Sequence, residues 1–318
     1  MKYFRNYPWG MQLLLFLLMT FTFLSCISVI VLSTFTKITG YDITAISDIT
    51  TATPYGLVQA ARVVQGVQNM FIFMLPAFTY AYLCHPTPAR YLGLRRPGKS
   101  IQLLLSVTLM AGAMPIFMLI KSGMELIDFG AKLKTEQAQL DNMVQGMMNM
   151  PTVGSFIATF IIMAVVPGVG EELFFRGVLM RFAKKRSRSM VAPVLFSAVV
   201  FAYAHSNVYG FLSIFLAGVL LAVIYQLTGS LWCSILAHTL FNGGQVFLSY
   251  LANNNKAIEA TMKTDSVPYG YAAAGAVVFA ASLWLLLKNR TPLPANWTDD
   301  FTPRELAELK QERENRQL

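Results

Sequence analysis

The chain has 318 residues, of which 55% are hydrophobic and only 13% are charged, and its mean hydropathy is +0.51. Soluble domains carry about a quarter charged residues, so this composition excludes an ordinary soluble protein. The net charge of +9 comes from arginines and lysines in short segments beside apolar runs. This placement favours contact with anionic lipid headgroups and argues against nucleic acid as a partner.

Eight apolar runs approach or exceed the roughly 20 residues that span a bilayer. Because an apolar helix satisfies its own backbone hydrogen bonds in lipid, they predict an all-α, polytopic membrane protein with about eight transmembrane helices. The fourth run is interrupted by PGVG, where Pro167 removes a backbone hydrogen bond, so helix four is expected to break or kink. In chain order the runs cover residues 11–35, 63–84, 101–120, 153–180, 190–204, 208–227, 231–251 and 269–287.

The runs divide the chain into three regions. Residues 1–150 hold three spans and a methionine-rich amphipathic stretch, residues 151–252 hold spans four to seven, and residues 253–318 hold the last span and a polar tail. Two interpretations of the stretch at 123–150 stay open: a helix that lies along the outer membrane interface and gates access to the bundle, or a helix packed on the bundle. In the tail, Thr302 and Pro303 are suited to start a helix.

The loops between the runs predict the orientation in the membrane. Arginines and lysines gather before span one, between spans two and three, and between spans four and five. Because basic loops stay cytoplasmic, we expect a multi-pass protein of the cell membrane with both termini inside. The first run is longer than the apolar core of a signal peptide, so it is interpreted as an uncleaved anchor helix.

Few ionisable side chains lie inside the apolar runs, where they are costly and usually functional. In span four, Glu172 and Arg176 lie four residues apart with the acid first, which favours an ion pair. Glu171 is rotated by about 100° from Glu172, so it needs a partner on another span, a water molecule or a proton. His238 and Asn242, also four residues apart, share one face of span seven.

His205 ends span five, and Phe201, one turn before it, is a ring expected to wall its site. Counted from the inner membrane surface at 1.5 Å per residue, His205 is expected to lie about 10 Å deeper than His238. From the residues alone, a structural polar cluster and a proton or ion pathway stay open beside a reaction site.

Three short motifs lie on successive helical segments. EELFFR has the pattern E-E-x-x-x-R, FAYAH has F-x-x-x-H, and HTLFN has H-x-x-x-N. In this order, over roughly residues 153–250, they resemble the CPBP (Abi) family of intramembrane proteases, which includes type II CAAX prenyl endopeptidases and bacteriocin-processing enzymes. No motif position departs from the family pattern.

The resemblance implies an intramembrane endopeptidase, a hydrolase that cleaves a peptide bond in a membrane-associated or lipidated protein or peptide. By this likeness Glu171 and His205 activate the attacking water, and His238 and Asn242 stabilise the oxyanion. A desolvated glutamate can act as a base near neutral pH, and preorganised donors at an oxyanion contribute strongly to catalysis. The supporting residues are Glu172, Arg176 and Phe201.

The family is often described as metalloproteases, and Glu171, His205 and His238 are candidates for the three ligands of a catalytic zinc ion. Because the chain lacks the H-E-x-x-H of zincins, we expect metal-free activation of water and no cofactor.

The expected partners are the lipid bilayer and a peptide or protein substrate. The substrate classes left open are a prenylated CAAX protein, a bacteriocin leader and another membrane-anchored protein. Two functions without proteolysis also stay open: a membrane scaffold or immunity factor on the same fold, and a proton-coupled transporter.

Overall fold

The computed structural model describes residues 4–256 and 269–299, and the single positions 258, 301, 304, 305, 307 and 311. These residues form helices and loops, and no strand occurs among them. The start of the predicted tail helix, Thr302 and Pro303, lies outside the described residues. Six helices in the described part are long and apolar enough to cross a membrane: Trp9–Thr39, Tyr55–Cys84, Ile101–Glu125, Val153–Lys184, Phe211–Thr228 and Tyr269–Lys288.

All eight predicted runs form helices, so the predicted class, a polytopic helical membrane protein, is confirmed. The count of eight spans is not confirmed. The fifth run forms the helix α10 (Val191–Ala204) of only 14 residues. The seventh forms α12 (Leu231–Asn254), which is long enough but not apolar enough to be among the six, because it carries His238, Asn242 and several other polar residues.

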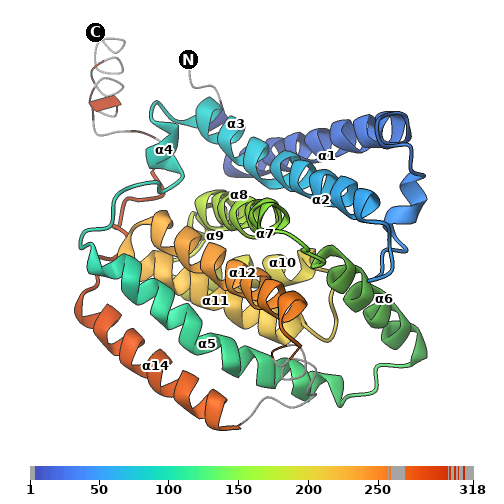
Figure 1. Cartoon of the computed structure of the whole chain (residues 1–318). Coiled ribbons are helices and arrows are strands. Elements are labelled where there is room, and N and C mark those ends of the chain that lie inside the picture. The colour runs from blue at the N-terminus through green and yellow to red at the C-terminus, as the bar shows by residue number, and fades with distance from the viewer. Residues whose placement is uncertain are drawn as a thin grey trace.

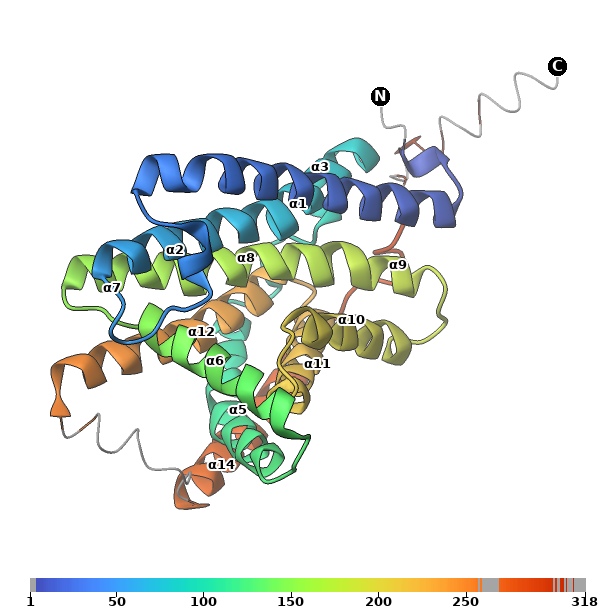
Figure 2. The same cartoon turned by 90° about the vertical axis from the view of Figure 1, so that its right-hand side faces the viewer.

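One long helix runs through the middle of the bundle (Figure 2). It covers Val153–Lys184 without interruption and measures 32 residues. Two stretches within it are π-helical, with a wider turn than an α-helix. In chain order its parts are α7 (Val153–Phe160), η4 (Ile161–Val165), α8 (Val166–Glu172), η5 (Leu173–Leu179) and α9 (Met180–Lys184).

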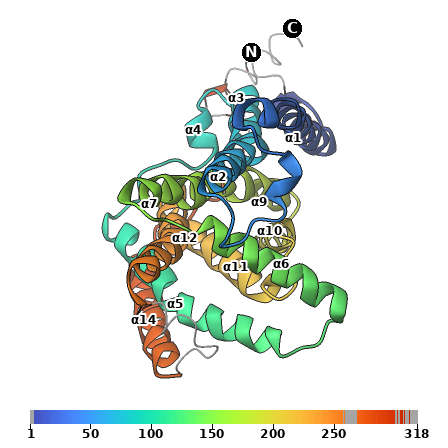
Figure 3. The ribbon, with the colours of Figure 1, turned by 45° about the vertical axis from the view of Figure 1, so that its right-hand side comes forward.

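The other helices form layers on both sides of this central helix (Figures 1 and 3). On one side lies the second span, with α1 outside it. On the other side lie α10, α11 and α12, followed by α5 and α14. The elements not yet given bounds are η1 (Phe4–Asn6), α1 (Trp9–Thr39), η2 (Ile43–Ile46), α2 (Tyr55–Asn69), η3 (Met70–Met74), α3 (Leu75–Cys84), α4 (Pro88–Tyr91), α5 (Ile101–Glu125), α6 (Ala131–Met147), α11 (Phe211–Thr228) and α14 (Tyr269–Lys288).

The prediction at PGVG was a break or a kink, and the helix is not broken there, since it continues from Val153 to Lys184. Pro167 lies in the first turn of α8, directly after η4, and the N–H of Val166 bonds to the carbonyl of Ile161, five residues earlier. A proline lacks the N–H that a regular helix needs, and the wider π turn before it keeps the chain helical past this position.

The two glycines of PGVG allow close approach of other helices. A Cβ at Gly168 would lie 3.0 Å from the backbone of Thr239 in α12, and one at Gly170 would lie 3.0 Å from Oδ1 of Asn69 in α2. Small residues at a helix crossing let backbones approach closely in membranes. The stretch therefore brings α12 and α2 against the helix just before its two glutamates.

The second span begins eight residues earlier than predicted, at Tyr55, so it includes Arg62. Arg62 is fully buried, and its Nε and Nη2 donate to the carbonyl of Met147 at 2.9 and 2.6 Å. Nη2 also donates to the carbonyl of Asn149 at 2.8 Å. Of the two interpretations of residues 123–150, packing on the bundle therefore holds for the C-terminal end of α6, while most of this helix is exposed.

Candidate active site

The ion pair predicted within the central helix is confirmed. Nη1 of Arg176 donates to Oε1 of Glu172 at 2.5 Å, and neither side chain has exposed surface. Nη2 of Arg176 donates to the carbonyl of Gly218 in α11 at 2.8 Å, and its guanidinium carbon lies 4.7 Å from the ring centre of Phe201 in α10. The pair therefore connects the central helix to two neighbouring helices.

Glu171 points to a different set of partners. Its Oε2 lies 4.0 Å from Nε2 of His205 and 3.9 Å from Nε2 of His238. The three side chains come from α8, from the residue after α10, and from α12. The convergence predicted from the motifs is present, and Glu172 turns away toward Arg176 as predicted.

The expected difference of about 10 Å in depth between the two histidines is wrong, because both lie within 4.0 Å of the same oxygen. The cause is the position of the α11–α12 turn. Ser230 and Leu231 are fully buried there, and the N–H of Leu231 donates to the carbonyl of Gly93 at 2.9 Å. By contrast α10 begins at the exposed Val191. Helix α12 therefore starts farther from the inner membrane surface than α10 does, and this brings His238 level with His205.

The hydrogen bonds of the two imidazoles fix their tautomers. Nδ1 of His205 lies 2.8 Å from the carbonyl of Phe201, and a carbonyl can only accept. Nδ1 of His238 lies 3.0 Å from Oε1 of Glu172, which accepts as a carboxylate. In each neutral ring Nδ1 therefore carries the hydrogen, and Nε2 presents a lone pair toward Glu171.

Three acceptors thus surround one point: Oε2 of Glu171 and the two Nε2 atoms of His205 and His238. Oε2 is buried and has no hydrogen-bond partner among the described residues. Neutral imidazoles in these tautomers cannot donate to it. A group with two donors, such as water, matches this arrangement of acceptors.

The link between His238 and Glu172 was missed by the sequence analysis, which paired Glu172 only with Arg176. In the structure Oε1 of Glu172 accepts from both Arg176 and His238. The carboxylate therefore orients the imidazole that faces Glu171, while Arg176 holds Glu172 in place.

Asn69 was also missed. Its Nδ2 donates to Oε1 of Glu171 at 3.1 Å from the last residue of α2. This bond holds one carboxylate oxygen and leaves Oε2 to face the histidines. A signal was available, because Asn69 follows Gln65 and Gln68 as a polar residue within a span.

Phe201 walls the site as predicted. Its ring centre lies 4.6 Å from that of His205 and 5.8 Å from that of His238. Asn242 is one turn beyond His238 and partly buried, and its side chain makes no hydrogen bond within the described part of the chain. The structure therefore brings Glu171, His205 and His238 together but does not join Asn242 to them by a direct bond.

The site is open on one side. The side chain of His205 is 36% exposed, against 5% for His238 and 9% for Glu171. The centre can therefore be reached past His205, while Glu172 and Arg176 close its opposite side.

The three side chains do not fit a zinc ion in this geometry. Zinc bonds of about 2.1 Å place two tetrahedral ligands about 3.4 Å apart, whereas the nitrogens of His205 and His238 lie 4.0 and 3.9 Å from the oxygen of Glu171. Within the described ranges no group of three or more His, Cys, Asp or Glu side chains has the arrangement of a metal site.

The fold and the site together define a polytopic helical membrane protein with a buried glutamate–histidine centre. Residues 153–244 match the family described as type II CAAX prenyl endopeptidase Rce1-like. The matched segment contains all three motifs, so the resemblance of this segment to the CPBP family of intramembrane proteases is confirmed. No curated protein and no solved structure matches the chain.

Proposed function

We propose that the chain is a CAAX-type intramembrane endopeptidase that hydrolyses a peptide bond with a water molecule activated by Glu171. One observation carries the proposal: the unpartnered Oε2 of Glu171 lies 4.0 and 3.9 Å from the Nε2 atoms of two histidines. The match to the Rce1-like family over residues 153–244 supports the same class of reaction.

In the first step, water lies between Glu171 and His205 and gives a proton to Oε2 of Glu171. Its oxygen attacks the carbonyl carbon of the substrate, and the lone pair on Nε2 of His205 orients the second O–H. The tetrahedral intermediate then collapses, the C–N bond breaks, and Glu171 returns the proton to the leaving amine. The step needs no covalent bond between the chain and the substrate.

The oxyanion requires donors, and we assign this role to His238 and Asn242. His238 can donate from Nε2 only when both ring nitrogens are protonated. Oε1 of Glu172 accepts from Nδ1 at 3.0 Å and holds the ring in the orientation that this donation needs. The amide of Asn242, one helical turn away, would supply the second donor once substrate is bound.

We propose that the reaction needs no metal, since the observed spacing exceeds that of a zinc ligand set. The proposed substrate is a membrane-associated or lipidated peptide or protein that approaches past the exposed edge of His205. The basic loops favour a cell-membrane location with both termini cytoplasmic.

Incubation of the purified chain in lipid nanodiscs with a library of peptides, some of them lipidated, tests the proposal. New peptide termini are identified by mass spectrometry. We expect cleavage by the wild type, with and without a chelator, and none by a Glu171→Ala variant of equal purity. The same termini from both proteins, or no cleavage of any peptide, would favour a scaffold or transporter.

A further inference from the structure

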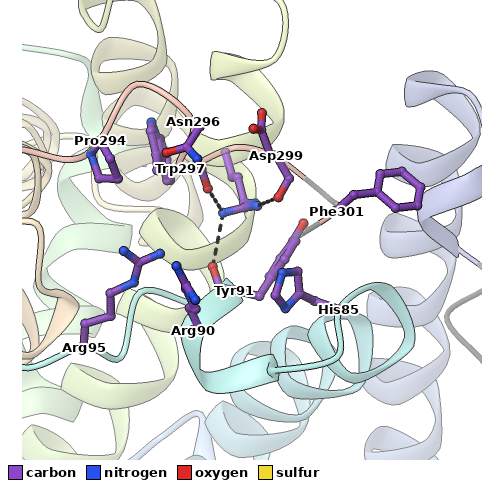
Figure 4. A pocket seen from close by; sticks show the side chains of 10 residues that line it. His85, Arg90, Tyr91, Arg95, Pro294, Asn296, Trp297, Asp299 and Phe301 are labelled. Carbon is purple, nitrogen blue, oxygen red and sulfur yellow. Dashed lines mark hydrogen bonds between the residues drawn. The ribbon is translucent and has the colours of Figure 1, made fainter. Parts of the chain in front are cut away.

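A polar cavity lies at the end of the bundle, away from the glutamate–histidine centre. It has a volume of about 210 Å³ and lies between α4, α9 and the segment 291–299 that follows α14 (Figure 4). The residues that line it include His85, Arg90, Tyr91, Arg95, Arg181 and Trp297.

The cavity lies where the membrane-spanning helices end. Cys84 ends α3, Lys184 ends α9 and Lys288 ends α14, and the lining comes from the segments after α3 and α14 and from Arg181 in α9. The basic loops of the sequence, at 90–99 and 181–188, gather at the same end. A group bound here would therefore lie at the height of lipid headgroups.

Positive charge dominates the lining. It contains three arginines and one carboxylate, Asp299, so its formal charge is +3 − 1 = +2 with His85 neutral. Figure 4 shows the carboxylate of Asp299 directed away from Arg90 and Arg95. The side chains of Arg90 and Arg95 make no hydrogen bond or ion pair within the described residues.

The charges in the lining act on one another. Partial burial and the nearby charge of Arg90 lower the pKa of Arg95, and Arg181 adds to this effect against an opposing contribution from Tyr225. Burial and the charge of Arg181 likewise lower the pKa of His85, against opposing contributions from the backbone of Thr87 and the carboxylate of Glu305. The cavity therefore carries a net positive charge that its one lining carboxylate, Asp299, does not balance.

Two buried donors in the lining also lack acceptors. Arg181 is only 3% exposed, and it donates to the carbonyls of Tyr91 at 3.3 Å, Asp299 at 2.9 Å and Trp297. Among the described residues its Nε has no partner, and neither has Nε1 of Trp297, a residue that is 5% exposed. Buried donors are normally satisfied, so these two point to an acceptor supplied by a ligand.

We propose that this cavity binds a phosphate group, carried either by an anionic phospholipid headgroup or by a soluble phosphate. Guanidinium groups recognise phosphate through paired, charge-assisted hydrogen bonds. The volume of about 210 Å³ is below that of sites for drug-sized ligands, which suits a phosphate and the part of a headgroup next to it.

A phosphate bound in the cavity would contact both the segment 291–299 and the central helix. This segment already bonds to α11, through the N–H of Thr291 to the carbonyl of Leu227 at 2.8 Å and the N–H of Leu293 to the carbonyl of Gln226 at 3.1 Å. Arg181 is in the same continuous helix as Glu171. A bound phosphate therefore stabilises the folded chain by mass action.

The test uses the full chain in nanodiscs and measures its melting temperature. One arm compares phosphatidylcholine alone with a mixture containing phosphatidylglycerol, and the other adds inorganic phosphate to phosphatidylcholine discs. For the wild type we expect a rise on the order of 5 °C with phosphatidylglycerol. A rise with inorganic phosphate as well assigns the site to the phosphate itself, and a rise with the lipid alone assigns it to the headgroup.

The variants R90Q/R95Q and R96Q/R188Q lose the same charge, but Arg96 and Arg188 are exposed and lie outside the lining. We expect R90Q/R95Q to lose most of the rise and R96Q/R188Q to keep it. Arg181 is left unchanged because its loss would free three carbonyls. An equal response of both variants, or no response of the wild type in either arm, overturns the proposal.

Discussion

The α5–α14 pair and the helices around Glu171 are held together by opposite means. Between α5 and α14, which lie side by side in Figure 1, a Cβ at Gly112 would lie 2.5 Å from the backbone nitrogen of Phe279. A Cβ at Gly275 would lie 2.8 Å from the carbonyl of Gly112. Around Glu171 the contacts are made by buried ionisable groups. Both regions are tightly packed, but only one uses charge.

The two regions differ in what their contacts cost in free energy. Glycine contacts join helices in a membrane at little cost, because the backbones approach closely and no charge is desolvated. Buried charges cost free energy, and replacement by apolar residues is often neutral or stabilising. A region that keeps Glu171, Glu172, Arg176 and two histidines where glycine would be enough therefore points to function.

Loss of the buried arginine should give the largest change in stability. Arg176→Ala leaves Glu172 buried beside His238 without its strongest partner, and removal of one partner of a buried pair costs about 3–5 kcal/mol. We expect a large drop in folded yield and melting temperature in detergent. Glu171→Ala is the control and should lose much less, because Oε2 of Glu171 has no partner within the described residues. Equal yields and melting temperatures for the two variants would contradict the assignment.

Asn242→Ala should affect the reaction and spare the fold. Loss of one oxyanion donor lowers kcat by about 100- to 1,000-fold. Because its side chain bonds to no described residue, the melting temperature should stay near that of the wild type. Steady-state kinetics with a substrate found in the peptide library measure the effect. A kcat of the Asn242→Ala variant equal to that of the wild type would show that Asn242 is not an oxyanion donor.

Gly112→Ala should lower the stability of the α5–α14 contact and leave the geometry around Glu171 unchanged. The added methyl would meet the backbone of α14, which cannot move aside as a side chain can, and overpacking costs about 1–3 kcal/mol. Gly123→Ala in the same helix is the matched control, since a Cβ there meets no atom within 4 Å. Thermal unfolding compares the two, and equal melting temperatures would show that the close contact is not needed.

Asn69→Ala should have the smallest effect. It removes one donor from Oε1 of Glu171, and a hydrogen bond to a charged group contributes about 1.5–3 kcal/mol at most. Because Asn69 positions Glu171 without touching the reacting atoms, we expect kcat to fall about tenfold with KM unchanged. Gln65→Ala, an exposed change in the same helix, is the control. A change in KM alone would assign Asn69 to substrate binding.

Local features of the chain could be predicted from sequence. The apolar runs predicted where the helices lie, because a helix is one of the few structures that form all backbone hydrogen bonds within a bilayer. The pairing of Glu172 with Arg176 followed from their four-residue spacing, which depends only on helix geometry. The motifs identified the residues that converge around Glu171, through a resemblance that the family match to residues 153–244 supports.

Contacts between different helices could not be predicted from the sequence. The bonds of Glu172 to His238 and of Asn69 to Glu171 depend on which faces of three helices meet. The predicted offset between His205 and His238 failed because the buried start of α12 is set by the loop at Gly93. At PGVG the sequence showed the proline but not the compensating π turn before it.

Comparison of wild-type and Glu171→Gln cleavage rates on one substrate tests the central claim most directly. The glutamine keeps the shape of the side chain and can still accept the bond from Asn69, but it cannot take a proton from water. We expect an unchanged melting temperature and a loss of rate on the order of 100- to 10,000-fold, the usual contribution of a general base. Full activity in the folded variant would contradict this claim.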